Sequence, residues 1–311
     1  MKRFHNILFV SSGIKDETEA LKQALLIANE SEASLSILII GPQFPQSFNQ
    51  YKRSYESFLK EHITKTIETA KRGIPAHQRK CAITIDIEWE NAPSIRIIQH
   101  ILRSAHDLLV KAAEDTKNTA GFKALDMALL RKCPCPLFLH RPLKHTKDIR
   151  IAAAIDTEHG GSTGQDLAIS LLKLTQSLVN YYHSEFSVIS CWDLILENFM
   201  RDSAWLKMSQ SEIDTMLLEE SNTHFLTLKK LIEKSEIKDK PTIYHLKGDP
   251  TEMIPITVHD KHIDMLVMGT VARTGISGFI IGNTAENILQ QIDCSLWALK
   301  PIGFISPVKA Y

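Results

Sequence analysis

Short apolar segments and longer amphipathic segments alternate along the chain. Residues 6–11 form a continuous apolar run of the kind that lies buried on both faces of a parallel sheet. Residues 18–30 instead carry apolar side chains at helical spacing. The same pattern predicts further strands at 34–40, 82–89, 108–112 and 137–140, and further helices at 51–71 and 93–104. The first half of the chain therefore alternates strands with helices.

The second half repeats this order of elements. Its predicted strands lie at residues 150–155, 186–191, 242–246, 265–268 and 296–299. Three pairs of segments match in type and in order, namely 7–12 with 151–156, 106–112 with 263–269, and 135–142 with 294–301. Such repetition indicates a duplicated domain. We therefore predict an α/β chain of two tandem, doubly wound parallel-sheet (Rossmann-like) domains, at residues 1–144 and 149–311.

The segment after the fourth strand of the second half carries spaced glycines. In doubly wound sheets, ligands bind beyond the carboxyl ends of the strands, where the strand order reverses. Gly269 ends that strand, and Gly282 precedes a predicted helix. Free N–H groups at a helix N-terminus form an anion site. Asn283 fits as the N-cap, with Glu286 as its capping partner. Without a ligand, the same residues would be a capped helix after a glycine turn.

The spacing of this segment is similar to a known signature. Gly269 is followed by two residues, Ala272, nine residues, Gly282 and Asn283. Together with the tandem layout, this resembles the nucleotide-binding signature of the universal stress protein family, which has glycine where Ala272 stands. A methyl group at Ala272 would crowd a phosphate or strain the backbone if φ were positive, and it would be harmless if φ were negative. The resemblance implies ATP or AMP as ligand, with or without Mg²⁺.

The resemblance also implies roles for individual residues of the second half. Asp156, at the end of its first strand, would lie near the nucleoside, and Ile189 near the adenine. Met268 and Gly269 would lie near the ribose and phosphates. Phosphates would be held by the backbone and side chains of Gly282, Asn283 and Thr284. Arg273 would meet a phosphate, as arginine often does, or remain a solvated loop residue. The family likeness further implies that the last strands of the two halves pair, so that the chain is its own pseudo-dimer.

The first half lacks this signature. Ser12 replaces the acidic residue of the first strand, and the segment after the fourth strand carries Glu114 and Asp115 but no spaced glycines. Carboxylates repel phosphates. The sequence therefore predicts a degenerate first domain without a phosphate site, its pocket filled by side chains or open to another ligand.

Charge and cysteine content narrow the function classes. Lys plus Arg and Asp plus Glu each number 36, so no overall basic surface for nucleic acid is expected. The five cysteines are an odd number in a long chain, which is not a disulfide framework. Cys133 and Cys135 are the one close pair, without a second pair at zinc-ligand spacing. No apolar run approaches the length of a membrane span. We expect a cytoplasmic protein without membrane insertion, and the sequence leaves self-association open.

Three functions remain after this reading. The first is a stress-response protein that binds an adenine nucleotide in its C-terminal domain. Because no catalytic residue can be assigned, we expect at most slow hydrolysis of ATP. The second is a nucleotide-free interaction scaffold that acts through its dimer-like surfaces. The third is a synthetase or pyrophosphatase, which the loop at residues 11–16 disfavours because Ile14 stands where that motif needs glycine.

Overall fold

Strands and helices alternate in both halves of the chain, as the sequence predicts. The computed structural model describes residues 4–76, 80–114, 120–145, 148–157, 161–202, 208–270 and 281–311. The N-terminal half contains the strands β1 (Asn6–Ser11), β2 (Ser34–Gly41), β3 (Ile83–Trp89), β4 (Leu108–Ala112) and β5 (Leu137–His140). Between them lie the helices α1 (Thr18–Ser31), η1 (Gln46–Tyr51), α2 (Lys52–Arg72), α3 (Pro93–Ser104) and α4 (Ala124–Lys132).

The C-terminal half follows the same order. Its strands are β6 (Arg150–Ala154), β7 (Glu185–Trp192), β8 (Thr242–Lys247), β9 (Met265–Gly269) and β10 (Ser295–Leu299). Its helices are α5 (Gly161–Tyr182), α6 (Glu197–Asp202), α7 (Gln210–Lys234), α8 (Pro250–Asp260) and α9 (Asn283–Leu289). Pro93 and Pro250 each occupy the first turn of a helix, where the missing N–H costs nothing.

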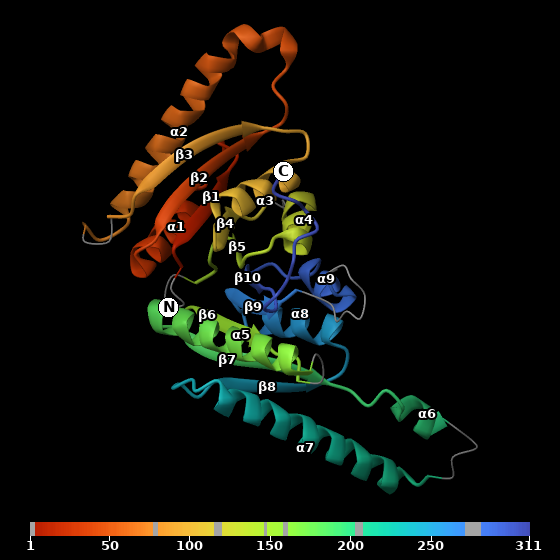
Figure 1. Cartoon of the computed structure of the whole chain (residues 1–311). Coiled ribbons are helices and arrows are strands. Elements are labelled where there is room, and N and C mark those ends of the chain that lie inside the picture. Colours follow the sequence, from red (N-terminus) through yellow and green to blue (C-terminus); the bar gives the residue numbers. More distant parts are fainter. Residues whose placement is uncertain are drawn as a thin grey trace.

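All these strands join one sheet, in the order β3-β2-β1-β4-β5-β10-β9-β6-β7-β8. Neighbouring strands are parallel within each half, and β5 and β10 meet antiparallel, with Phe138 opposite Trp297. Their rings stack with centroids 4.6 Å apart. The two halves therefore stand side by side around this junction (Figure 1). The predicted fold class and the predicted pairing of the last strands are confirmed, whereas the domain bounds stay a prediction.

Helices cover both faces of the sheet. One apolar core lies on the face of α1, α2, α5 and α7, and a second lies on the face of α3, α4, α8 and α9. Each core takes residues from both halves, so burial continues across the junction. Beyond β10, the C-terminal tail returns toward α3 and α4 of the N-terminal half (Figure 1). No described helix is both long enough and apolar enough to cross a bilayer.

Candidate functional site

The strand order reverses between β6 and β9. β6 pairs with β7 on one side and with β9 on the other, and Ala153 lies beside Val267. Because the two strands are parallel and in register, the residues that follow them emerge at the same edge of the sheet. Asp156 leaves β6 there, and Gly269 and Thr270 leave β9 there. The fold thus brings together the predicted residues of two distant segments at the place where doubly wound sheets bind ligands.

The segment after β6 is held by β7. The N–H of Ile155 donates to the carbonyl of Ile189 at 2.9 Å, and the hydroxyl of Ser190 donates to the carbonyl of Ile155 at 2.7 Å. These bonds fix the backbone on which Asp156 stands, and its side chain is exposed. The next hydroxyl, Oγ1 of Thr157, is buried and has no hydrogen-bond partner among the described residues. An acidic group and an unused hydroxyl therefore adjoin the carboxyl end of β6.

Ile189 and Met268 lie deeper than a ligand-facing role requires. Their side chains are 0% and 4% exposed and belong to the core on the α8 and α9 face. Ile189 also sits within β7, which continues to Trp192. Both residues can therefore face a ligand only through their main chains, and Trp192 is the residue that ends the strand.

Gly269 and Thr270 form the end of β9. A Cβ atom on Gly269 would lie 2.8 Å from Cδ2 of Leu167 in α5, so close packing accounts for a glycine there. Thr270 is fully buried, and its Oγ1 accepts a hydrogen bond from Nζ of Lys300 at 2.8 Å. Burial lowers the pKa of Lys300 to about 8. A buried amine thus fixes the point where the chain leaves β9.

Helix α9 begins at this same edge. The N–H of Gly282 donates to the carbonyl of Thr270 at 3.3 Å, which places the helix start beside the end of β9. Asn283 and Thr284 are exposed, and the N-cap residue makes no side-chain capping bond. The first N–H groups of a helix have no intrahelical acceptor. Among the residues that the structure describes, none accepts these first N–H groups of α9, which lie beside the end of β9.

The predicted cap of this helix is wrong. Gly282 is the N-cap, with an extended backbone at φ −66° and ψ 140°, and Asn283 is already the first helical residue. Glu286 does not reach back to the cap, because its carboxylate pairs with the guanidinium of Arg131 in α4. A contact between the two halves thus replaces the predicted capping box. Two other predicted site residues, Ala272 and Arg273, lie outside the described residues.

A pair of histidines lies next to this edge, and sequence reasoning missed it. Nδ1 of His224 in α7 is 2.9 Å from Nε2 of His245 in β8, and the ring of His245 stacks on Trp192 at the end of β7. His224 is 4% exposed, and its Nε2 has no partner among the described residues. Burial lowers the pKa of His224, while the nearby carboxylate of Asp156 opposes this shift. The pair therefore adds uncharged, partly unused hydrogen-bonding groups near Asp156.

The corresponding edge of the N-terminal half is filled by its own side chains. Nζ of Lys111, on β4, donates to Oδ1 of Asp126 at 2.9 Å, and both side chains are buried. The carboxylate of Glu114 accepts hydrogen bonds from the N–H groups of Leu125 and Asp126 at 2.8 and 3.3 Å. Glu114 thus occupies the N-terminus of α4 where an anion would bind.

Glu17 adds a further acid to this filled edge. It accepts a hydrogen bond from the hydroxyl of Ser11 at the end of β1 and one from the N–H of Ser12. Burial raises the pKa of Glu17 and of Asp126, and the ammonium of Lys111 opposes both shifts. The N-terminal half therefore presents carboxylates in the place where the C-terminal half presents free N–H groups.

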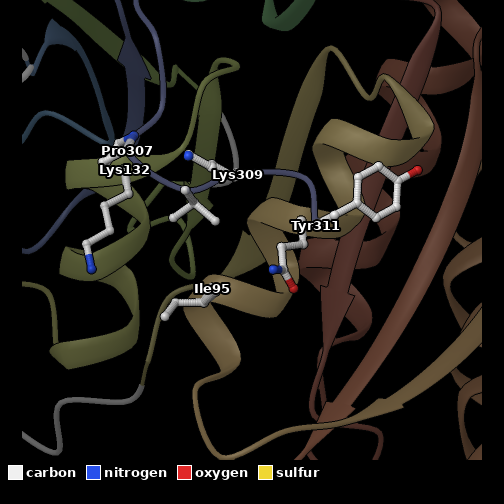
Figure 2. Close-up of a pocket in the computed structure, with 7 residues that line it drawn as sticks. Ile95, Lys132, Pro307, Lys309 and Tyr311 are labelled. Atoms are coloured by element: carbon white, nitrogen blue, oxygen red, sulfur yellow. The ribbon is translucent and has the colours of Figure 1, made fainter.

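A separate hollow lies away from both edges. Its volume is about 300 Å³, and it lies between α3, the end of α4 and the C-terminal tail. Figure 2 shows Ile95 of α3, Lys132 at the end of α4, and Pro307, Lys309 and Tyr311 of the tail around this hollow. The hollow contains none of the predicted site residues. Within the described residues, no group of three His, Cys, Asp or Glu side chains is arranged to hold a metal ion.

Comparison with known sequences gives consistent matches. Residues 164–300 match the model of the universal stress protein family. Over 319 residues, the chain is 26% identical to universal stress protein E of Photorhabdus laumondii, an alignment that covers 100% of this chain and 99% of the relative.

Solved structures resemble the whole chain. A protein of unknown function from Pseudomonas aeruginosa matches with a TM-score of 0.70 at 21% identity, covering 96% of this chain and 93% of the other. A universal stress protein from Archaeoglobus fulgidus matches with a TM-score of 0.61 at 12% identity, covering 95% and 98%. At these identities, the likeness concerns the fold.

Proposed function

We propose that this chain, which resembles universal stress proteins over its whole length, binds an adenine nucleotide, ATP or AMP, in its C-terminal half in a cytoplasmic response to stress. The N-terminal half is proposed to bind no nucleotide. The domains of this proposal are residues 1–144 and 149–311. All five cysteines are free thiols, which suits the reducing cytoplasm.

The observation that carries the proposal is the open N-terminus of α9. Its first N–H groups have no acceptor within the described part of the chain, and they adjoin the end of β9 through the bond between Gly282 and Thr270. Asn283 and Thr284 can add side-chain donors to the same phosphates. The backbone of Gly282 has negative φ, so the glycine is not required by its conformation. A side chain at this N-cap would stand next to the proposed phosphates, which a glycine leaves accessible.

The nucleoside would lie toward β6 and β7. The carboxylate of Asp156 suits the hydroxyl groups of a ribose. The partly buried ring of His245, which stacks on Trp192, suits an aromatic base, because aromatic rings stack favourably. Gly269 and the main chains of Met268 and Ile189 lie between these groups and the phosphate end. In this arrangement, Mg²⁺ would be held mainly by the phosphates and water, as is usual for this ion.

Binding rather than turnover is the proposed role. Asp156 and the two histidines supply hydrogen bonds to a bound nucleotide, and the proposal assigns them no catalytic step. Bound nucleotide would favour one arrangement of the protein over another and so report the energy state of the cell. We expect the protein to hydrolyse ATP slowly at most.

An interaction scaffold is the second candidate function. The exposed apolar side chains of Ile195, Leu196 and Phe199, at and beside α6, favour it, because such groups are common at binding surfaces. Strands β5 and β10 pair with each other, so neither edge is free for a partner. A scaffold, or a homo-oligomer of this chain, would therefore use other surfaces than these edges.

Calorimetric titration of ATP, AMP and GTP into the full-length protein tests the proposal. Gly282→Val places a branched side chain where the phosphates would lie, and we expect it to weaken ATP binding by roughly 100-fold or more. The matched control is Lys123→Val, which alters the N-cap of α4 in the other half and should leave the affinity unchanged. Absence of saturable binding to folded, nucleotide-free protein would refute the proposal and favour the scaffold.

A further inference from the structure

Two cysteines face each other where α4 meets β5. Cys133 directly follows α4, and Cys135 stands two residues before β5, with Pro134 between them. The side chains are 1% and 7% exposed, and their sulfur atoms are 3.6 Å apart. This separation suits a hydrogen bond between two thiols. The segment lies outside the proposed nucleotide site and has no part in it.

The backbone between these cysteines permits a disulfide. Residues two positions apart have Cα atoms at most about 7 Å apart, which is the upper limit for a disulfide. The sulfur atoms would need to approach by about 1.5 Å to reach bonding distance. Pro134 carries no N–H, so its own backbone donates no hydrogen bond that this movement could break. Formation of a disulfide between Cys133 and Cys135 therefore requires movement of the two side chains and only a local adjustment of the backbone.

The surroundings favour one negative charge on the pair. The hydrogen bond from Cys135 lowers the pKa of Cys133, and the ammonium of Lys300 lowers it further. The same hydrogen bond and burial raise the pKa of Cys135. The pair thus gives up one proton readily and the second reluctantly. Because thiolates and not thiols are nucleophiles, this arrangement raises the reactivity of the pair as a unit.

A cavity gives access to the second of the two cysteines. It has a volume of about 460 Å³ and lies at the amino ends of β4 and β5, lined by Ile101, Leu102, His106, Asp107, Pro134 and Cys135, among others. His106 is buried, and neither of its ring nitrogens has a hydrogen-bond partner among the described residues. Burial lowers its pKa to about 4, so the ring is neutral at physiological pH. The wall therefore offers an unused polar group to a small, uncharged, hydrogen-bonding molecule.

We propose that Cys133 and Cys135 form a peroxide-sensitive dithiol, which hydrogen peroxide in this cavity oxidises to an intramolecular disulfide. Cys133 carries the thiolate, and it accepts the proton of Cys135 along the contact between the sulfurs as the sulfur of Cys135 attacks one peroxide oxygen. The O–O bond breaks, and the departing hydroxide takes a proton and leaves as water. Cys133 then attacks the sulfur of the sulfenic acid on Cys135, the S–O bond breaks, and a second water leaves with the remaining proton. Two thiols lose two electrons, and one peroxide becomes two waters.

Peptide mapping of the full-length protein tests this proposal. Trypsin should release residues 133–144, which contain both cysteines and no other, because Pro142 protects Arg141 from cleavage. After limiting peroxide and alkylation, we expect this peptide to be unalkylated and two hydrogen masses lighter than the reduced form, with reversal by dithiothreitol. Its thiols should be consumed roughly tenfold faster than Cys81, whose pKa is raised by burial.

Two variants separate the switch from general thiol damage. Cys135→Ser should end oxidation of Cys133 to a disulfide within the peptide, whereas the double variant Cys81→Ser and Cys191→Ser should leave it at the wild-type rate. Phenylarsine oxide, which bridges neighbouring thiols, should bind one equivalent to the wild type and none to Cys135→Ser. Oxidation of Cys81 before the pair, or irreversible sulfinic acid at either cysteine without a disulfide, would overturn the proposal.

Discussion

Helices α4 and α9 occupy corresponding places in the two halves, yet their N-termini differ in what they contact. At α4, the carboxylate of Glu114 accepts two main-chain N–H groups. At α9, the N-cap makes no side-chain bond, and the helix starts beside the end of β9. The same local fold therefore either satisfies its own donors or leaves them for a ligand. Under the proposed function, the duplicated domain keeps its sheet in both halves and a nucleotide site in one of them.

The buried residues around these helices differ in a matching way. The alignment of residues 106–112 with 263–269 places Lys111 opposite Met268, and the alignment of residues 135–142 with 294–301, extended back along α4 and α9, places Asp126 opposite Ala285. The N-terminal half thus buries an ion pair where the C-terminal half buries two apolar side chains. The N-terminal half therefore has the desolvation cost of two buried charges at this edge, and the C-terminal half does not.

The largest expected effect comes from breaking this ion pair. Lys111→Met leaves the carboxylate of Asp126 buried without its cation, and we expect it to lower the free energy of unfolding by about 3 to 5 kcal/mol. The double variant Lys111→Met and Asp126→Ala carries the residue types that the C-terminal half has at these two positions. It should restore the free energy of unfolding to within about 1 kcal/mol of the wild type. Urea unfolding followed by circular dichroism measures both. Equal losses in the single and double variants would contradict the comparison.

The second effect concerns the paired strands at the junction. His140 in β5 corresponds to Leu299 in β10, and burial lowers the pKa of His140 to about 4. Because the unfolded chain binds this proton more tightly, stability present above pH 6.5 is lost as the pH falls through 6.5 toward 4. The decrease in the free energy of unfolding between pH 7 and pH 4.5 should be about 2 kcal/mol smaller in His140→Leu than in the wild type.

Unfolding at a series of pH values measures this slope. The matched control, Leu299→Met, removes no titrating group and should keep the wild-type dependence. An unchanged slope in His140→Leu would show that the proton is taken up elsewhere, with His106 as the next candidate because its pKa is lowered to a similar value.

The smallest effect is expected at Gly269, which corresponds to Ala112 in the N-terminal half. Gly269→Ala should cost about 1 kcal/mol, since the new methyl group meets the flexible end of Leu167. Adding Leu167→Ala should relieve that contact. If Gly269→Ala lowers the affinity for ATP and the affinity stays low in the double variant, the glycine also serves the ligand. If affinity returns, packing against α5 is its whole role.

The sequence predicted the order of the elements and the duplication, because buried strands and repeats are local or periodic signals. The pairing of β5 with β10 came from the family resemblance. The sequence missed the contacts between distant segments. His224 and His245 are on different elements, and no spacing rule joins them. The cap at Asn283 was wrong because Arg131, from the other half, holds Glu286. The depth of Ile189 and Met268 depends on packing, which periodicity does not give.

The stoichiometry of ATP binding to the full-length wild-type protein, measured by isothermal titration calorimetry, tests the comparison between the halves most directly. The account predicts one nucleotide per chain, because α9 leaves its N-terminal donors free and Glu114 already occupies those of α4. Two nucleotides per chain would contradict the filled edge of the N-terminal half. None would contradict the open site of the C-terminal half.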